Sequence, residues 1–417
     1  MSDAPEAAAH PTPARARGFA VAIVATLVMA VSYVDRQALA ALAPTVRPAL
    51  HLSQTQYGWL TSAFAFSYLA FAPVSGAMLD KVGARRGVVW AVLFWSGVAA
   101  AHALVPGFGV LFALRALLGM AESPSFPAAA QTIRRVLGPR DQSTGYGMIF
   151  TGSSFGAMVA APLAIALATR WGWRSSFVLT ACVGLSWVPL WLFVTAHPSV
   201  RAAFAHVDRA VAREKLGKQD LSTLARALLL IVATAPVVMF VLNWFPQVLE
   251  GACGVPQERI GRYVWAPALT MDLGSVGFGW IVSRRERAAA RLGGRAEKRD
   301  LVALGALCAA CIALVPLAHD PVRATALGAV ATLGGGAVYS VLTGELMSRL
   351  PGARVASAGG LCASAQSVAH IIAAPLVGRS IDHTHGYGAA ALGLGLAVLP
   401  GALAWIVWPA RAREPSA

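Results

Sequence analysis

Charged side chains are scarce in this chain. Asp, Glu, Lys and Arg make up 13% of its 417 residues and hydrophobic residues make up 57%, whereas soluble domains contain about 25% charged residues. The mean hydropathy is +0.62. The composition therefore excludes an ordinary soluble protein, and its long apolar runs predict an all-α protein that crosses a membrane many times.

Cysteine and the common catalytic signatures are also scarce or missing. The five cysteines are odd in number and lie mostly in apolar runs, so no disulfide framework is predicted. Cys308 and Cys311 have the spacing of a redox or metal pair, but the surrounding run has no His or carboxylate, and we expect them to be packing residues. No phosphate-binding loop, zinc-protease motif or nucleophile elbow is present. We expect neither an enzyme nor a pump driven directly by ATP, and no metal or other cofactor.

Long apolar runs are what the chain has in abundance. Twelve can be drawn, beginning near Gly18, Gln54, Gly87, Phe108, Gln142, Arg174, Ser222, Gln257, Asp300, Val322, Arg354 and Gly386. A charged stretch, 197–219, separates the first six from the last six. This predicts two six-helix bundles, 18–196 and 222–409, a linker at 197–221, and polar tails at 1–17 and 410–417. The first tail lacks the features of a cleaved signal peptide.

The net charge is +15, and the positions of the Lys and Arg residues along the chain indicate the topology. If the N-terminus is cytoplasmic, the inner loops and tails hold 25 of the 34 Lys and Arg residues, the outer loops hold 7, and Arg36 and Arg115 fall within spans. An excess of Lys and Arg in short loops marks the cytoplasmic side. The basicity therefore predicts cytoplasmic termini in an inner-membrane protein rather than a nucleic-acid partner.

Two adjacent charges, Asp35 and Arg36, interrupt the first apolar run. A charge at the centre of a spanning helix costs about 2.5–3.5 kcal/mol on insertion scales, and such residues usually face a polar pathway. On a helix Tyr33 and Arg36 share a face, whereas Asp35 points about 100° away from Arg36. We expect Arg36 to hold a carboxylate with its planar fork, with Tyr33 adding a hydroxyl. The alternative is a buried structural ion pair.

Asp35 and Glu122 are carboxylates in different runs. A buried carboxyl group that alternates between paired and unpaired surroundings can take up and release a proton near neutral pH. Arg115 precedes Glu122 by seven residues, about 10.5 Å along one helix face, so the two could flank a proton relay without touching. A purely structural Arg115 is the alternative.

A glycine-rich motif lies between the second and third runs and contains Gly76, Asp80, Gly83, Arg85 and Arg86. Its glycines suit a tight turn and a close helix approach. Asp80 is placed to meet basic residues or a helix N-terminus across the inner face, so we expect an inner latch between the halves. The alternative is that its basic residues only mark topology. A second copy between the eighth and ninth runs has Ser283 in place of the acid, which makes a second latch doubtful.

These features together resemble the major facilitator superfamily. Within it, four further stretches resemble the anion:cation symporter branch, which includes sialin and bacterial carriers of galactonate, hexuronates and glucarate. They are Tyr33-Val34-Asp35-Arg36, residues 115–128, residues 172–177 and residues 272–280. The resemblance implies two six-helix bundles that alternate access to a site between them. It also implies that Asp35 and Glu122 carry protons, that Arg36 anchors the substrate, and that Arg115 assists the switch.

The resemblance also suggests further ligands. Tyr68 matches a cavity aromatic of galactonate-type carriers, and the Gly152-Ser153-Ser154 stretch, with Ser153, stands where those carriers have a Gln. In the second half we select the polar or aromatic residues Asn243, Trp244 and Gln366.

Three other residues of the second half receive structural interpretations. We expect an interhelical hydrogen bond from His370 and a role in helix packing for Asp272. Glu345 precedes an inner loop, and we expect it to be solvated or part of an inner gate.

The reading that best fits these residues is a proton-coupled symporter importing a small organic anion, such as a sugar acid or another carboxylate. The alternatives are a proton antiporter exporting a drug or metabolite and a membrane sensor that resembles a carrier. The expected partners are the anion and the lipid bilayer, with the proton as coupling ion. We expect a monomer.

Overall fold

The computed structural model describes residues 13–138, 140–205, 220–291, 298–349 and 352–408. These residues are almost entirely helical, and no strand occurs among them. The predicted tail 410–417, most of tail 1–17 and most of linker 197–221 lie outside the described residues. So do several of the basic residues that were used to predict topology, namely Arg209, Arg213, Lys215, Lys218, Arg295, Arg411 and Arg413.

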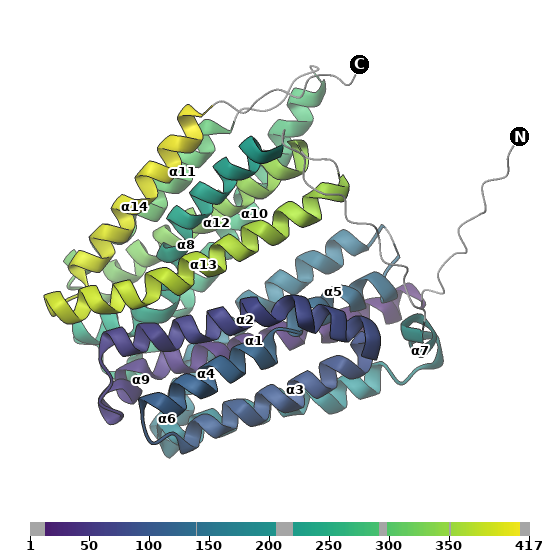
Figure 1. The fold of residues 1–417 in the computed structure, drawn as a ribbon, viewed down its shortest axis with the longest axis horizontal. Coiled ribbons are helices and arrows are strands. Elements are labelled where there is room, and N and C mark those ends of the chain that lie inside the picture. Colours follow the sequence, from purple (N-terminus) through teal and green to yellow (C-terminus); the bar gives the residue numbers. More distant parts are fainter. Residues whose placement is uncertain (1–12, 139, 206–219, 292–297, 350–351, 409–417) are drawn as a thin grey trace, which may run out of the picture.

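The first half of the chain forms one bundle (Figure 1). Its helices are α1 (Arg15–Ala49), α2 (Gln54–Val82), α3 (Ala84–Ala101) with the 3-10 turn η1 (His102–Leu104), α4 (Phe108–Glu122), α5 (Ser125–Val136) and α6 (Gln142–Val194). The short helix α7 (Pro198–Ala205) follows.

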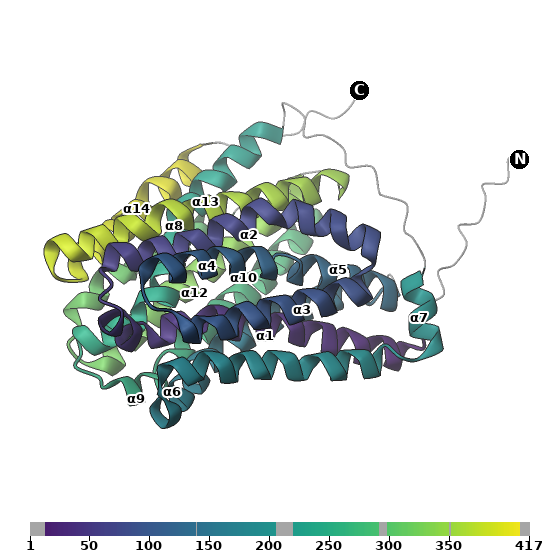
Figure 2. The same ribbon diagram turned by 60° about the horizontal axis from the view of Figure 1, so that its bottom comes forward.

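The second half forms the other bundle. Its helices are α8 (Asp220–Gly251), the short α9 (Gln257–Ile260), α10 (Trp265–Arg291), α11 (Arg299–Ala310) with the 3-10 turn η2 (Cys311–Leu317), α12 (Pro321–Arg349), α13 (Gly352–Thr384) and α14 (Gly388–Val407). In both views α7 and α9 lie at opposite ends of the long helices (Figure 1 and Figure 2). We use them to name the α7 side and the α9 side of the protein.

The predicted twelve spans are confirmed, although helices and spans do not match one to one. Within the described residues, nine helices are long and apolar enough to cross a membrane. The 53-residue α6 contains two spans, because Gly172 adopts a φ of 82° and turns the chain there. The fourth span is divided into α4 and α5 between Glu122 and Ser125. The remaining crossing is α10, which ends in a run of arginines.

Small residues let the helices of the first half cross closely. A Cβ atom added at Gly152 or Gly156 of α6 would overlap backbone carbonyls of α1, at Thr26 and Ala30. Side chains are therefore excluded at these two positions, and α1 lies directly against α6. This contact fixes the rotation of α1 about its axis and with it the directions in which Asp35 and Arg36 point.

The two halves are in contact on the α9 side. There α2 and α13 lie so close that a Cβ atom at Gly58 or Gly378 would overlap the backbone of the other half. Toward the α7 side the ribbons of α2 and α13 draw apart (Figure 1). The hydrogen bonds identified between described residues of the two halves, such as Ser62 Oγ to the Ile371 carbonyl at 2.7 Å, lie in the middle of the spans or on the α9 side.

Candidate functional site

Arg36 lies at the middle of α1 inside a ring of aromatic side chains. Its guanidinium carbon is 4.5 Å from the centre of the Tyr33 ring, 4.6 Å from that of Phe64 and 5.0 Å from that of Tyr68. Such distances are those of cation–π contacts. The structure thus brings the predicted Tyr33 and Tyr68 to Arg36, and it adds Phe64, which the sequence interpretation missed. Phe64 precedes Tyr68 by one helical turn, and that spacing was the available signal.

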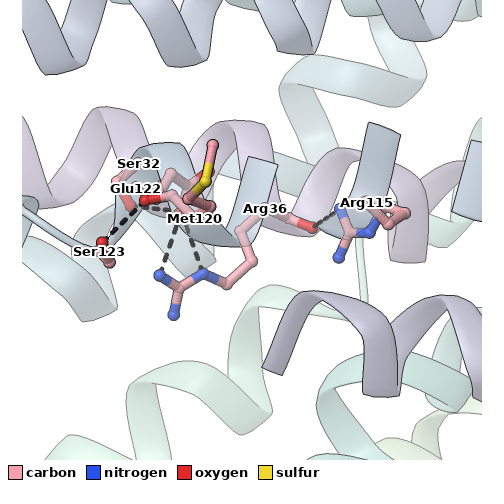
Figure 3. Close-up of polar contacts among 6 residues, drawn as sticks. All are labelled: Ser32, Arg36, Arg115, Met120, Glu122 and Ser123. Atoms are coloured by element: carbon pink, nitrogen blue, oxygen red, sulfur yellow. Dashed lines mark hydrogen bonds and ion pairs between the residues drawn. The ribbon is translucent and has the colours of Figure 1, made fainter. Parts of the chain in front are cut away.

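Glu122 is the anionic partner of Arg36 (Figure 3). Arg36 donates from Nη2 at 3.1 Å and from Nε at 3.3 Å, both to Glu122 Oε2. Ser32 Oγ donates to the same oxygen at 2.7 Å. The other oxygen, Oε1, is buried and accepts no hydrogen bond from the described residues. The carboxylate is thus bonded on one side only, which leaves an oxygen available for a proton.

The position of Glu122 follows from the break in the fourth span. α4 ends at Glu122, and the hydroxyl of Ser123 donates to the Met120 carbonyl at 2.7 Å, so that this freed acceptor at the helix end is satisfied (Figure 3). The break holds the carboxylate at mid-depth between α1 and α2. Ser32, which the sequence interpretation also missed, precedes Arg36 by one turn on the same face of α1.

Arg36 and Glu122 differ in their access to solvent. The side chain of Arg36 is 19% exposed, whereas that of Glu122 is fully buried. Two Arg36 nitrogens, Nε and Nη2, bond to a single carboxylate oxygen. While Glu122 holds these two, Nη1 is thus the one guanidinium nitrogen of Arg36 without a hydrogen bond among the described residues.

Asp35 points away from this pair, as the helical spacing predicts. Its side chain is buried, with 3% exposure, and lies next to Trp95 of α3 and Thr180 of α6. The charge of Glu122 still acts on it electrostatically. The adjacent charges of α1 therefore occupy two different environments.

Arg115 completes what we call the central cluster, namely Asp35, Arg36, Arg115 and Glu122. Arg115 is buried and does not form an ion pair with Glu122 among the contacts of the described residues. Its Nη1 instead approaches the backbone carbonyl of Arg36 at 3.5 Å (Figure 3), and its guanidinium lies 4.8 Å from the centre of the Phe64 ring. The expectation that Arg115 and Glu122 flank a relay without touching is consistent with this geometry.

The second half contributes polar but uncharged groups near Arg36. His370 of α13 interacts electrostatically with Arg36, and its Nε2 bonds to the Ala235 carbonyl of α8 at 3.1 Å, as predicted. Gln366 lies one turn before His370 on the same helix face. Tyr339 of α12, which the sequence interpretation missed, is 42% exposed and lies near enough to Tyr33 for an electrostatic effect between the two phenol groups.

Three other predicted ligands are not brought to Arg36. Trp244 is fully buried and donates from Nε1 to Gln54 Oε1 at 3.0 Å, between the halves on the α9 side. Asn243 bonds to the Met239 carbonyl of its own helix. Ser153 likewise bonds to the Ile149 carbonyl. In this conformation their roles as ligands stay predictions.

Ser154, the neighbour of Ser153, does bond to the other half. Ser154 Oγ donates to Asp272 Oδ1 at 2.6 Å, which links α6 to α10 across the two bundles. Asp272 thus contributes to packing between halves, which refines the packing role expected for it.

The inner motif forms its turn, and the hydrogen bonds of its side chains to other described residues stay within the first half. Gly83 has a φ of 84° and joins α2 to α3, as the tight turn requires. The space around Gly76 is open, so the expected close approach is absent there. Asp80 accepts from Gln131 of α5 at 2.6 Å and Arg85 donates to Thr195 at 3.1 Å, both within the first half. Arg86 is exposed. The latch across the halves stays a prediction.

Glu345 is not solvated, which corrects one of the two expectations for it. It is 4% exposed and pairs with Lys298 at 2.9 Å and with Arg226 at 3.9 Å. Lys298 also pairs with Glu286. These four residues, Arg226, Glu286, Lys298 and Glu345, form what we call the end cluster, on the α7 side of the second half. No local pattern predicts this cluster, because its members are spread over more than a hundred positions.

On the α9 side a polar network joins the halves. Asp382 of α13 accepts from the backbone N–H groups of Gln54 and Thr55 at 2.8 Å each, and from the Thr55 hydroxyl at 2.6 Å. Arg47 and Gln54 both donate to Gln247 Oε1 of α8, at 2.9 and 3.0 Å. A carboxylate from one half thus caps the N-terminus of a helix in the other.

The described residues contain no group of three or more His, Cys, Asp or Glu side chains placed to hold a metal ion. The central cluster instead offers a cation with an unused donor and a carboxylate with an unused oxygen. Such an arrangement can bind an anion and a proton.

Comparisons with known proteins identify a family and several relatives of this chain. The sequence profile of the family described as Major Facilitator Superfamily matches residues 25–374. The chain is 25% identical to a hexuronate transporter of Escherichia coli, with 96% of this chain and 95% of the relative covered. It is also 25% identical to a D-galactonate transporter of Escherichia coli, with 94% and 95% covered.

A solved structure shares the fold at lower sequence identity. It is a bacterial homolog of the human lysosomal transporter Spinster in an inward-facing and occupied conformation. The TM-score is 0.79 at 16% identity, and 95% of this chain and 97% of the other are covered.

Proposed function

Because this chain belongs to the Major Facilitator Superfamily, whose members are transporters and not enzymes, we propose that it is a proton-coupled symporter of a small organic anion. It takes up a sugar acid or another carboxylate across a bacterial inner membrane, with both termini in the cytoplasm. The two halves rock about the central cluster and expose it alternately on the α9 side and the α7 side.

The partial exposure of Arg36 is the observation that best supports a small organic anion as the substrate. A guanidinium presents a planar fork that matches a carboxylate, and the Arg36 side chain is 19% exposed. The rings of Tyr33, Phe64 and Tyr68 hold the guanidinium in place. The names of the hexuronate and D-galactonate relatives support a sugar acid as the anion.

Coupling to protons follows from competition for Arg36. With Glu122 ionised, its Oε2 occupies Nη2 and Nε of Arg36. A proton on Glu122 removes the negative charge that holds these donors, so that both become free for the substrate carboxylate. Binding of the anion and binding of the proton thus favour each other. Once the proton leaves on the other side, Glu122 competes again and the anion is released.

Two variants in proteoliposomes test the proposal. Arg36→Ala should abolish both substrate binding and transport, because it removes the partly exposed guanidinium that is proposed to bind the carboxylate. Glu122→Gln should abolish proton-driven accumulation of the sugar acid but leave counterflow exchange, since a glutamine cannot release a proton. The matched control is Glu250→Gln, which changes an exposed carboxylate on the α9 side.

Two outcomes would contradict the proposal. If Glu122→Gln still concentrates the substrate like the unaltered protein, Glu122 does not couple transport to protons. The direction in which the external pH changes on substrate addition distinguishes the proposed symporter from the antiport alternative. Substrate added outside should make the external medium more alkaline in a symporter and more acidic in a proton antiporter.

A further inference from the structure

Asp35 lies in a small polar compartment inside the first bundle. Around it are Trp95 and Ser96 of α3 and Thr180 and Gly184 of α6. The indole of Trp95 and the hydroxyl of Thr180 are next to the carboxylate. A Cβ atom at Gly184 would stand 2.8 Å from Ser96 Oγ and 3.6 Å from Asp35 Oδ2. A larger residue at Gly184 would therefore displace the Ser96 hydroxyl and come into contact with the Asp35 carboxylate.

The polar atoms of this compartment are unusually poor in hydrogen bonds. Asp35 Oδ1, Asp35 Oδ2, Trp95 Nε1 and Ser96 Oγ are all buried, and each completes no hydrogen bond within the described part of the chain. The Thr180 hydroxyl donates to the Phe177 carbonyl of its own helix at 3.2 Å. Buried polar groups are normally paired, so several unpaired ones in one place need an explanation. Here the unpaired donors and the unpaired acceptors lie together.

Few charges reach the compartment. Glu122 of α4 is the ionisable group that acts on Asp35. The groups contributed by α3 and α6 are an indole, two hydroxyls and a glycine, none of which is charged. Arg36, although adjacent in sequence, pairs with Glu122 on another face of α1. Hydrogen-bond donors, rather than a cation, are therefore what the surroundings offer to an ionised Asp35.

We propose that Trp95, assisted by Ser96 and Thr180, is a positioning residue for Asp35 that sets how tightly this carboxylate holds a proton. Small shifts of α3 and α6 complete hydrogen bonds from Trp95 Nε1 and the hydroxyls to the ionised carboxylate. When Asp35 is protonated, its O–H donates to a hydroxyl oxygen of Ser96 or Thr180. This inference rests on the proposed proton-coupled transport and assigns the residues that tune its second carboxylate.

The test is Trp95→Phe, compared with Trp187→Phe. Both remove one indole N–H from the first bundle, but Trp187 Nε1 donates to the Val24 carbonyl at 2.7 Å and is not part of the compartment. The measurement is the external pH at which proton-driven uptake is half-maximal. Without the Trp95 donor the ionised form is less stabilised, so protonation occurs at higher pH. We expect Trp95→Phe to raise this pH by at least half a unit, and Trp187→Phe to leave it unchanged.

A second pair of variants guards against loss of folding in Trp95→Phe. Thr180→Val removes the hydroxyl at nearly constant volume and should shift the same midpoint in the same direction. Thr180→Ser restores the hydroxyl and should return the midpoint to that of the unaltered protein. A merely structural role would lower uptake equally at every pH, without moving the midpoint. That outcome for Trp95→Phe and Thr180→Val together would overturn the inference.

An Asp35→Asn background separates this inference from the function on which it rests. If Asp35→Asn leaves the pH dependence of uptake unchanged, the coupling role of Asp35 itself fails. If Asp35→Asn changes the pH dependence, Trp95→Phe should have no further effect in that background. An additional shift of the midpoint there would show that Trp95 acts through another group and would contradict the inference.

Discussion

Both halves of the protein bury a cluster of charges, but at different depths and facing different neighbours. The central cluster lies at mid-depth in the first half, and its Arg36 remains partly exposed. The end cluster lies on the α7 side of the second half, where Lys298 and Glu345 pair inside the bundle and are almost inaccessible. Arg226 there stacks on Trp405 at 4.3 Å and donates to its carbonyl at 2.9 Å.

The difference shows that burial of charge alone does not indicate a transport site. In the end cluster each of these ion pairs joins oppositely charged groups of the same half, as in a structural ion-pair network. In the central cluster an unbonded carboxylate oxygen and an unused guanidinium nitrogen remain. The clearest difference is the access of the arginine to solvent, since the Arg36 side chain is 19% exposed and that of Arg226 is 5% exposed. Variants of the two clusters should differ accordingly.

Among these variants, Arg36→Lys is expected to have the largest effect, which is a loss of substrate uptake. Lysine keeps the charge but loses the planar fork and the stacking among three rings. Loss of one charge-assisted hydrogen bond and of the ring contacts, about 3 kcal/mol together, should lower uptake at limiting substrate at least 100-fold. Initial-rate uptake of a sugar acid in proteoliposomes measures this loss. Arg226→Lys is the matched control, and an equal fall in uptake there would remove the contrast between the clusters.

The second effect is on stability and belongs to the end cluster. Glu345→Ala removes one of the two carboxylates that face the buried Lys298. Breaking such a buried pair costs about 3 kcal/mol, so the thermal unfolding temperature of the purified protein should fall by several degrees. The substrate concentration for half-maximal uptake should stay unchanged. A normal unfolding temperature with a changed substrate affinity would place Glu345 in the transport pathway instead.

The third effect concerns the balance between conformations. Asp382→Asn weakens the carboxylate that caps α2 from the other half. A loss of about 1 kcal/mol here should shift the population about fivefold toward states that are open on the α9 side. Spin labels at His51 and His383, in a cysteine-free background, report the distance between the halves.

Asp320→Asn supplies the control for this comparison. Asp320 lies on the α9 side as well, but its Oδ2 accepts from Arg323 N at 3.0 Å and so caps a helix of its own half. Its replacement should leave the label distances unchanged. If both variants broaden the distances equally, the cap across the halves does not hold this conformation.

The smallest effect is expected for Tyr68→Phe. This variant keeps the ring 5.0 Å from the Arg36 guanidinium and removes only the hydroxyl. If the hydroxyl contacts the sugar acid, the half-saturating substrate concentration should rise two- to fivefold, as for the loss of one neutral hydrogen bond of about 0.5–1 kcal/mol. The maximal rate should not change. Tyr68→Ala removes the ring too, and an effect no larger than that of Tyr68→Phe would argue against a stacking role.

Much of the fold could be predicted, because it depends on the order and spacing of residues that are close together in the sequence. Twelve apolar runs, the turn at Gly83 and the divergence of Asp35 from Arg36 all depend on spacing along a single helix. The break in the fourth span was not predicted, although Ser123 and Pro124 mark it. A helix that ends inside a membrane needs its freed carbonyls to be satisfied, and that depends on three-dimensional neighbours.

The site could be predicted only in part, for a related reason. Arg36 and Glu122 could be selected as costly intramembrane charges. Their pairing across 86 positions has no local signal, and neither has the contribution of Phe64. Trp244 was selected because it is polar-tipped and aromatic, yet its indole bonds to Gln54 between the halves. The sequence shows which side chains are unusual, whereas the contact between bundles decides which of them meet.

The cap on α2 also makes hydration part of the conformational change. In this conformation the first N–H groups of α2 bond to Asp382 of the other half. When the halves separate on the α9 side, water must replace the carboxylate at these donors, and the carboxylate must itself be rehydrated. Opening on the α9 side therefore increases the number of water molecules bound to the protein. Osmolytes that are excluded from protein surfaces should accordingly favour the α9-side-closed form, so that the transporter responds to the water activity outside the membrane.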